Sequence, residues 1–159
     1  MKFTKREMPN REGNGISNYL KMDDGQNVTG VFRGEVHEFY QTWPPGGQKQ
    51  IFDVPTTGAS PRFKANFVMH EDGKFVAKVW EFGLTVYNQL AEISENYNIE
   101  ETKVKITRRG VSKSTQWMII PLGPVDKKAL APIKAVELNI LNGQASQPAQ
   151  ETTGDEAPF

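Results

Sequence analysis

The clearest pattern in the chain is an alternation of apolar and polar residues over residues 62–70, RFKANFVMH. Phe63, Ala65 and Phe67 alternate there with charged or amide side chains, which is the period of a half-buried β-strand. Val104 and Ile106 alternate with polar residues in the same way. Together with turn signals and β-branched or aromatic runs, the pattern predicts five strands. They are expected over residues 28–43, 62–70, 74–82, 102–109 and 115–121.

Between the third and fourth of these strands the apolar period changes to that of a helix. The residues that share one helical face are Val86, Leu90, Ile93 and Tyr97. Gly30 and Gly34 lie inside the first strand, where interior glycines indicate a bend or a bulge. Residues 44–61 are rich in proline and glycine and are expected to form a loop. A last short helix is expected over residues 131–141.

The order of strand, strand, strand, helix, strand and strand predicts a mainly β protein. A five-stranded Greek-key barrel is the oligonucleotide-binding fold, or OB-fold. We therefore expect an OB-fold barrel with a helix between strands 3 and 4. Four regions follow: a flexible basic arm (1–17), the OB-fold domain (18–122), a C-terminal extension with the short helix (123–141) and a disordered acidic tail (142–159).

Composition excludes several kinds of site. The 159 residues include no cysteine, which excludes disulfides and thiol nucleophiles. With only two histidines, no metal site and no cofactor is expected. No segment reaches the ~18 apolar residues of a membrane span, so we expect a soluble, intracellular protein. No nucleotide-binding or hydrolase motif occurs. A nuclease would need clustered carboxylates, for which Glu35, Glu38 and Glu81 are the strand candidates, so no enzyme is predicted.

Charge is distributed unevenly although the formal net charge is zero. Residues 102–121 carry five basic residues and no acidic one, whereas residues 142–159 carry three acidic residues and no basic one. Such asymmetry between segments indicates different partners for different parts of the chain. The basic segment indicates a cationic surface on the strands, and the acidic segment indicates an anionic C-terminus.

Basic side chains recur on three predicted strands, with aromatic residues nearby. Proteins that hold single strands without sequence preference combine a cationic groove with rings on which bases stack. A surface lysine can equally serve solubility alone, and Trp80 can pack in the core instead of stacking. The predicted nucleic-acid-binding residues are Arg33, Tyr40, Trp43, Arg62, Lys64, Lys74, Lys78, Trp80, Lys103, Lys105 and Arg109.

Three segments together resemble a known family. RFKANF, GKFVAKVWEFGLTVYNQLAEI and KVKITRRGVSKSTQWMIIPLG are similar to the core of bacteriophage single-stranded DNA-binding proteins of the helix-destabilising type. The resemblance covers roughly residues 18–122. It implies a protein that coats and protects single-stranded DNA during phage DNA replication, recombination and repair, in the cytoplasm of the infected bacterial host. Some relatives have a zinc-binding insertion, which a chain without cysteine cannot share.

The C-terminal GDEAPF resembles the acidic tip of many such proteins. The resemblance implies that this tip docks replication and repair proteins, with a terminal aromatic ring in an apolar pocket and acids facing basic residues. The residues concerned are Asp155, Glu156, Pro158 and Phe159. Some relatives self-associate on DNA through a basic N-terminal segment, for which Lys2, Lys5 and Arg6 are the candidates here. The alternative function is an OB-fold protein-interaction module that does not bind nucleic acid.

Overall fold

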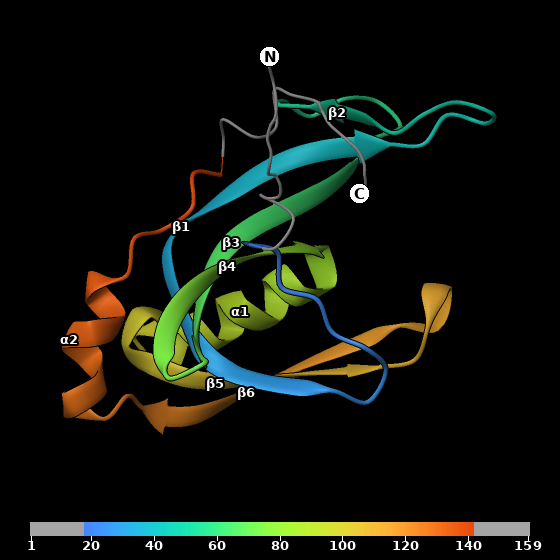
Figure 1. The fold of residues 1–159 in the computed structure, drawn as a ribbon. Helices are drawn as coiled ribbons and strands as arrows, with labels where there is room; N and C mark the ends of the chain where they lie inside the picture. The colour runs from blue at the N-terminus through green and yellow to red at the C-terminus, as the bar shows by residue number, and fades with distance from the viewer. Residues whose placement is uncertain (1–17, 142–159) are drawn as a thin grey trace, which may run out of the picture.

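The computed structural model describes residues 18–141, and the predicted N-terminal arm and acidic tail lie outside the described residues. The described chain is mainly β, with two α-helices (Figure 1). Its elements are β1 (Asn27–Thr42), β2 (Gln50–Phe52), β3 (Ser60–Glu71), β4 (Lys74–Gly83), α1 (Leu84–Asn96), η2 (Ile99–Glu101), β5 (Thr102–Arg109), η3 (Ser112–Ser114), β6 (Gln116–Pro124) and α2 (Lys127–Ala135).

Each of the five predicted strands is present, and α1 lies between the third and fourth of them. A sixth strand, β2, was not predicted and forms inside the expected loop 44–61. It runs antiparallel to the end of β1, where Tyr40, Gln41 and Thr42 pair with its three residues. A three-residue strand leaves no periodic pattern, so this pairing is set by the fold of the connection.

The strands form one antiparallel sheet in the order β4-β3-β1-β5-β6, with β2 paired to β1. The prediction of a closed five-stranded barrel is wrong for this sheet, because it has six strands and its outer strands β4 and β6 do not pair. Strand β1 bends where its register against β3 shifts between Arg33 and His37. Gly34 lies within this shift with a φ of +79°, a conformation that favours glycine. Gly30 permits β1 to approach β3 closely, since a Cβ atom there would lie 2.3 Å from the carbonyl oxygen of Val68.

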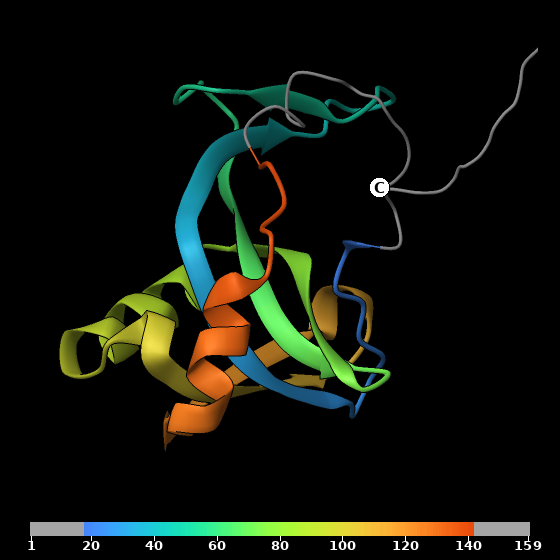
Figure 2. The same ribbon diagram turned by 60° about the vertical axis from the view of Figure 1, so that its left-hand side comes forward.

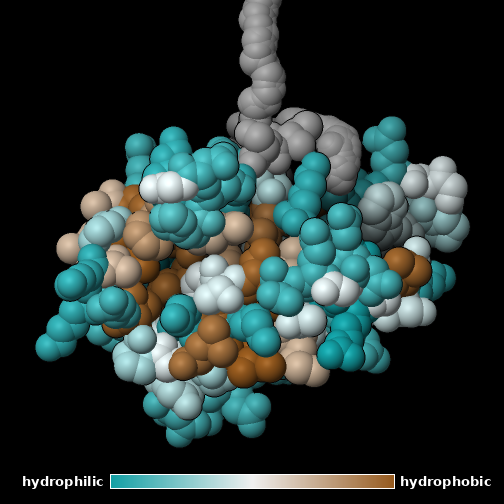
Figure 3. All heavy atoms as spheres, turned by 60° about the horizontal axis from the view of Figure 1, so that its bottom comes forward, coloured by the Kyte–Doolittle hydropathy of each residue, from teal (hydrophilic) through white to brown (hydrophobic). Residues whose placement is uncertain are grey.

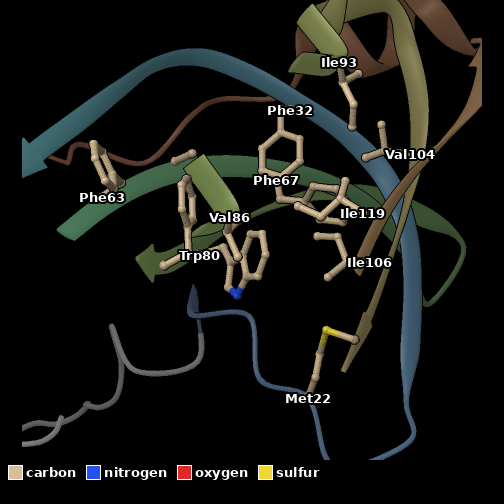
Figure 4. Packing of buried hydrophobic residues seen from close by; sticks show 12 residues of the cluster. Met22, Phe32, Phe63, Phe67, Trp80, Val86, Ile93, Val104, Ile106 and Ile119 are labelled. Carbon is tan, nitrogen blue, oxygen red and sulfur yellow. The ribbon is translucent and has the colours of Figure 1, made fainter. Parts of the chain in front are cut away.

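The main core lies between the curved sheet and α1 (Figure 4). Helix α1 contributes Val86 and Ile93, two residues of the predicted helical face. Aromatic side chains fill much of this core, including Phe32, whose ring lies 4.9 Å from that of Phe67 and meets it edge to face. Trp80 belongs to the same cluster and is 3% exposed.

The gap between β4 and β6 is filled by side chains and by the segment that precedes β1. The amide of Leu20 donates to the carbonyl oxygen of Val79 at 2.8 Å, which satisfies the edge of β4. The Gln89 side chain of α1 donates to Trp117 O at 3.0 Å and accepts from Ile119 N at 3.1 Å, which satisfies the edge of β6. Across the gap, the rings of Trp80 and Trp117 meet edge to face at 5.3 Å.

Helix α2 covers the outer face of β1 and β3 (Figure 2). Its Ile133 packs on Val31 and Val68 in a second, smaller core. The short helix was predicted over residues 131–141 but spans Lys127–Ala135, because Asp126 caps its start and the chain leaves the helix at Val136. The following segment is fixed to the sheet by Asn139.

Asn139 bonds Asn66 of β3 in both directions: its backbone amide donates to Asn66 Oδ1 at 2.9 Å, and its carbonyl oxygen accepts from Asn66 Nδ2 at 3.0 Å. Its side chain also donates to the carbonyl oxygen of Ala77 at 3.0 Å, on strand β4. The segment after α2 therefore holds both strands of the β3–β4 hairpin.

We predict that Gln89→Ala lowers the free energy of unfolding by about 1–3 kcal/mol, since it leaves a partly buried carbonyl and amide without partners. Urea denaturation followed by tryptophan fluorescence measures the change. The matched control is Asn88→Ala, which removes an exposed amide from the position immediately before Gln89 in the same helix. Equal effects of the two substitutions would contradict this role of Gln89.

Candidate nucleic-acid interface

One face of strands β1 and β3 brings together several of the predicted cations and the exposed indole. Cross-strand partners share a face of the sheet, and residues two apart along a strand share it too. His37 pairs with Lys64, and Phe39 pairs with Arg62. We call this surface the Trp43 face. It comprises His37, Phe39, Gln41, Trp43, Lys49, Arg62 and Lys64.

Trp43 follows the last residue of β1 and has the largest exposure of the three tryptophans, 65%. Trp43 begins the β1–β2 connection, a segment that lies in the upper right part of Figure 1. The ammonium of Lys49, in the same connection, lies 6.0 Å from the ring centroid, which is the range of a cation–π contact. An exposed indole beside a cation is suited to a ligand that carries both a flat ring and a negative charge.

Lys64 is a nearly buried cation at the centre of this face. It is 6% exposed, and its ammonium lies 5.3 Å from the centroid of the Phe39 ring. Burial lowers the pKa of Lys64; Glu81 opposes that shift and Lys49 adds to it. Glu81 itself pairs with Arg62, whose Nε lies 3.4 Å from its carboxylate oxygen. The face thus holds three cations, one of them desolvated.

His37 lies beside Lys64 in the register and stacks on Phe39 with ring centroids 5.9 Å apart. Its Nε2 atom is buried and has no hydrogen-bond partner, and the same holds for Oε1 of Gln41. Burial lowers the pKa of His37, Lys64 lowers it further, and Asp53 acts in the opposite direction. The imidazole is therefore held towards its neutral form.

Four predicted residues have other surroundings. Tyr40 lies on the opposite side of β1, and its hydroxyl donates to the carboxylate of Glu38, which raises the tyrosine pKa. Trp80 is buried in the core, so its predicted stacking role is corrected to core packing. Arg33 donates from Nη1 to the carbonyl oxygens of Ile133 and Val136, at 3.0 and 3.1 Å, and so caps α2. Lys78 pairs with Glu71 at 3.4 Å.

Lys74 is exposed at the β3–β4 turn, away from the Trp43 face. It lines a shallow pocket of about 380 Å³ between that turn and α2, together with His70 and Phe75. The His70 and Phe75 rings meet edge to face at 5.0 Å. Helix α2 borders this pocket, whereas the β1–β2 connection lies beside the Trp43 face. The two are therefore separate surfaces.

The remaining predicted cations lie on the outer face of β5, a strand in the lower half of Figure 1. Lys103, Lys105 and Arg109 alternate with the core residues Val104 and Ile106. Their partners in the register of β1 and β6 include no acidic residue. On β6 the same face exposes apolar side chains, and brown and teal atoms are mixed over this side of the molecule (Figure 3). The β5–β6 face comprises Lys103, Lys105, Arg109, Met118, Ile120 and Leu122.

Sequence reasoning missed Lys49 and gave His37 no binding role. Lys49 lies in the irregular connection before β2, where no periodicity shows which way a side chain points. His37 follows the β-bulge, so its face could not be counted from the start of the strand. The signal that was available is local: a basic residue six positions after an exposed tryptophan in a Pro-Gly connection.

Two further features of the described residues bear on the site. No group of three histidine, aspartate or glutamate side chains within residues 18–141 is arranged to hold a metal ion. Neither α-helix in that range is long and apolar enough to cross a membrane. Of the carboxylates considered for a nuclease, Glu81 pairs with Arg62 and Glu38 accepts from Tyr40.

Comparison with protein-family models, curated proteins and solved structures finds no significant match to this chain.

We predict that Lys64→Met stabilises the protein. A lysine pKa lowered in the folded state means that folding disfavours the charged form, so at neutral pH the buried ammonium opposes folding. Methionine retains most of the apolar stem and removes the charge. Urea denaturation at pH 7 should show a higher midpoint for Lys64→Met, whereas Lys103→Met, at an exposed position of β5, should change little. A lower midpoint for Lys64→Met would contradict the prediction.

We also predict that His37 makes the fold more sensitive to acid. Because its pKa in the folded protein lies below the usual imidazole value of 6.5, the unfolded chain binds more protons as the pH falls through 6.5. The contribution of His37 to stability is therefore retained above that pH and lost below it. Denaturation of the wild type and His37→Gln between pH 7.5 and 5 should show a smaller loss in the variant, and parallel curves would refute this assignment.

Proposed function

We propose that this protein binds single-stranded DNA through the Trp43 face. The observation that carries the proposal is the exposed indole of Trp43 beside the cation Lys49, at the end of a strand face that also carries Arg62 and Lys64. We further propose that the sheet is an open variant of the OB-fold, in which β1, β3, β4, β5 and β6 correspond to the five strands of that fold. The position of α1 between β4 and β5 supports that reading.

The chemistry of the face suits a single strand better than a duplex. An indole offers a flat apolar surface to an unpaired base, and every base has such a surface, so binding does not require a particular sequence. The cations attract the phosphate backbone and release counterions when it binds. Bases in a duplex are already stacked on one another and do not present their faces. The role that follows is to coat and protect single strands during phage DNA replication, recombination and repair.

Recruitment of replication and repair proteins by the acidic C-terminal tip is part of the same proposal. The residues concerned, Asp155, Glu156, Pro158 and Phe159, lie outside the described residues, so the support for this part is the sequence alone. An anionic tail beyond a cationic sheet lets one chain contact DNA and a protein partner through different segments.

The β5–β6 face favours a second candidate function, the docking of a protein partner. Met118, Ile120 and Leu122 are 47%, 37% and 46% exposed on adjacent outward positions of one strand. The cations of β5 lie beside them, and Lys105 pairs directly with Ile120. Apolar side chains bordered by cations fit a partner segment that carries apolar and acidic residues. Aromatic rings, which a nucleic acid would stack on, are missing from the residues that define this face.

We predict that Trp43→Ala weakens binding of oligo-dT by about 1–3 kcal/mol, or roughly 5- to 150-fold in Kd, because the stacking surface is lost. Lys49→Gln should instead reduce the slope of log K against log salt by about 0.7, the contribution of one phosphate contact on a single strand. Fluorescence anisotropy of a labelled oligonucleotide at several salt concentrations measures both effects.

Two controls separate the interface from general surface effects. Val54→Ala removes another exposed apolar residue of the β1–β3 connection, and Lys127→Gln removes an exposed cation from α2. Neither should change binding. Oligo-dT should quench the intrinsic fluorescence of the wild type, with most of that response absent in Trp43→Phe. A wild-type protein that does not respond to oligonucleotide even at low salt would refute DNA binding and leave the docking function as the better account.

A further inference from the structure

Two buried polar atoms on the Trp43 face lack hydrogen bonds, and a largely buried lysine lies on the same face. Nε2 of His37 and Oε1 of Gln41 are buried and unpartnered. Lys64 is 6% exposed, and its ammonium makes a cation–π contact with the ring of Phe39. Buried polar atoms are paired in the great majority of cases, so a cluster of exceptions indicates a missing partner.

His37 and Lys64 are neighbours within this cluster. They are direct partners in the β1–β3 register, and their side chains share one face. Phe39 contacts both, because the His37 ring stacks on it and the Lys64 ammonium lies over it. The phenyl ring therefore forms the floor between an imidazole nitrogen and an ammonium group.

The charges around this pair favour an anion. Lys49 lies close enough to Lys64 to lower its pKa, so two cations repel each other here. The nearest opposing carboxylate, Glu81, already pairs with Arg62 at 3.4 Å. On the other side, Asp53 is the acidic group that acts on His37. An anion between His37 and Lys64 would offset both the repulsion and the burial of the ammonium.

The donors specify the chemistry of the ligand. An ammonium has three N–H donors and no acceptor, and Nε2 of an imidazole donates when it carries the proton. A ligand that satisfies His37 and Lys64 must accept several hydrogen bonds and carry negative charge, which describes a phosphate group.

We infer that Lys64 and His37 form a phosphate-binding site that holds one phosphodiester of the bound strand. This inference rests on the proposed function, since Trp43 on the same face supplies the ring for a nearby base. It goes further in assigning a direct contact to a buried lysine and a role to His37. The lowered pKa of each group in the free protein is consistent with a site that lacks its anion.

The first test uses inorganic phosphate and no DNA. In ¹⁵N-labelled protein at constant ionic strength, phosphate should shift the imidazole nitrogen signals of His37 in a saturable way. The other histidine of the chain, His70, lies on the far side of α2 and serves as the internal reference. Signals of His37 that stay unmoved, or that move no more than those of His70, would overturn the site and assign the unpartnered atoms to buried water.

Variants at Lys64 test the second ligand. Lys64→Gln should abolish the response of His37 to phosphate, and Lys64→Arg, which retains the charge, should restore much of it. Lys127→Gln, on α2, should leave the response unchanged. If Lys64→Gln binds phosphate as well as the wild type does, the assignment of Lys64 is wrong. The backbone amide spectrum of each variant reports whether it is folded.

The second test separates a DNA phosphate from a free one. A set of oligo-dT molecules, each with one neutral methylphosphonate linkage at a different position, is bound to wild type and to Lys64→Gln. At one position, the neutral linkage should weaken binding to the wild type roughly tenfold and leave binding to the variant unchanged. The variant already lacks the charged hydrogen bond from Lys64 that the neutral linkage removes. A phosphate response in a protein that binds no DNA would refute the proposed function and this inference together. DNA binding with no linkage dependence that requires Lys64 would refute the inference alone.

Discussion

The two outer strands of the sheet are stabilised without pairing to each other, and much of the molecule depends on how this is achieved. Unpaired edges invite intermolecular pairing, and natural sheets cover them. In this sheet β4 and β6 are not paired by backbone hydrogen bonds. The edge carbonyls of β4 bond Leu20 and Asn139, and the edge of β6 bonds the side chain of Gln89. Two of the three indoles, those of Trp80 and Trp117, fill the space between the strands. This use of tryptophan in the gap leaves Trp43 as the most exposed of the three indoles.

Periodicity predicted the five long strands and α1 because these elements are amphipathic on their own. It failed where two patterns meet on one strand. Lys78 and Trp80 are two residues apart on β4 and share a face. The binding role predicted for the lysine was therefore extended to the tryptophan. In the structure Lys78 lies nearer the β3–β4 turn and pairs with Glu71, whereas Trp80 is buried in the core. On β3 both faces are covered, one by the core and one by α2 and Asn139. No local pattern could show this, because the cover is about 70 residues away in the chain.

The same limit explains which site residues could be predicted. Trp43, Arg62 and Lys64 were identified by residue type and strand position, and the β1–β3 register brings two of them onto one face. Lys49 joins them only because the connection folds back as β2. The separation of Lys103, Lys105 and Arg109 from this group follows from the curvature of β1, which pairs with β5 at its start and with β2 at its end. Counting cations along a sequence cannot show that they belong to two surfaces.

A buried lysine without a carboxylate partner is costly to keep, since desolvation of a charge outweighs a single cation–π contact. Arg62 takes the carboxylate that lies across from Lys64, although a direct Lys64–Glu81 pair would be the simplest way to neutralise the buried charge. Stability alone therefore does not account for the arrangement, whereas a site for an external anion does. A buried charge that lowers the stability of the fold and is nevertheless kept is typical of functional positions. In the proposed function, the attraction of a polyanion to a chain with no net charge would depend on the local excess of the cations Lys49, Arg62 and Lys64 over Glu81 on this side of the sheet.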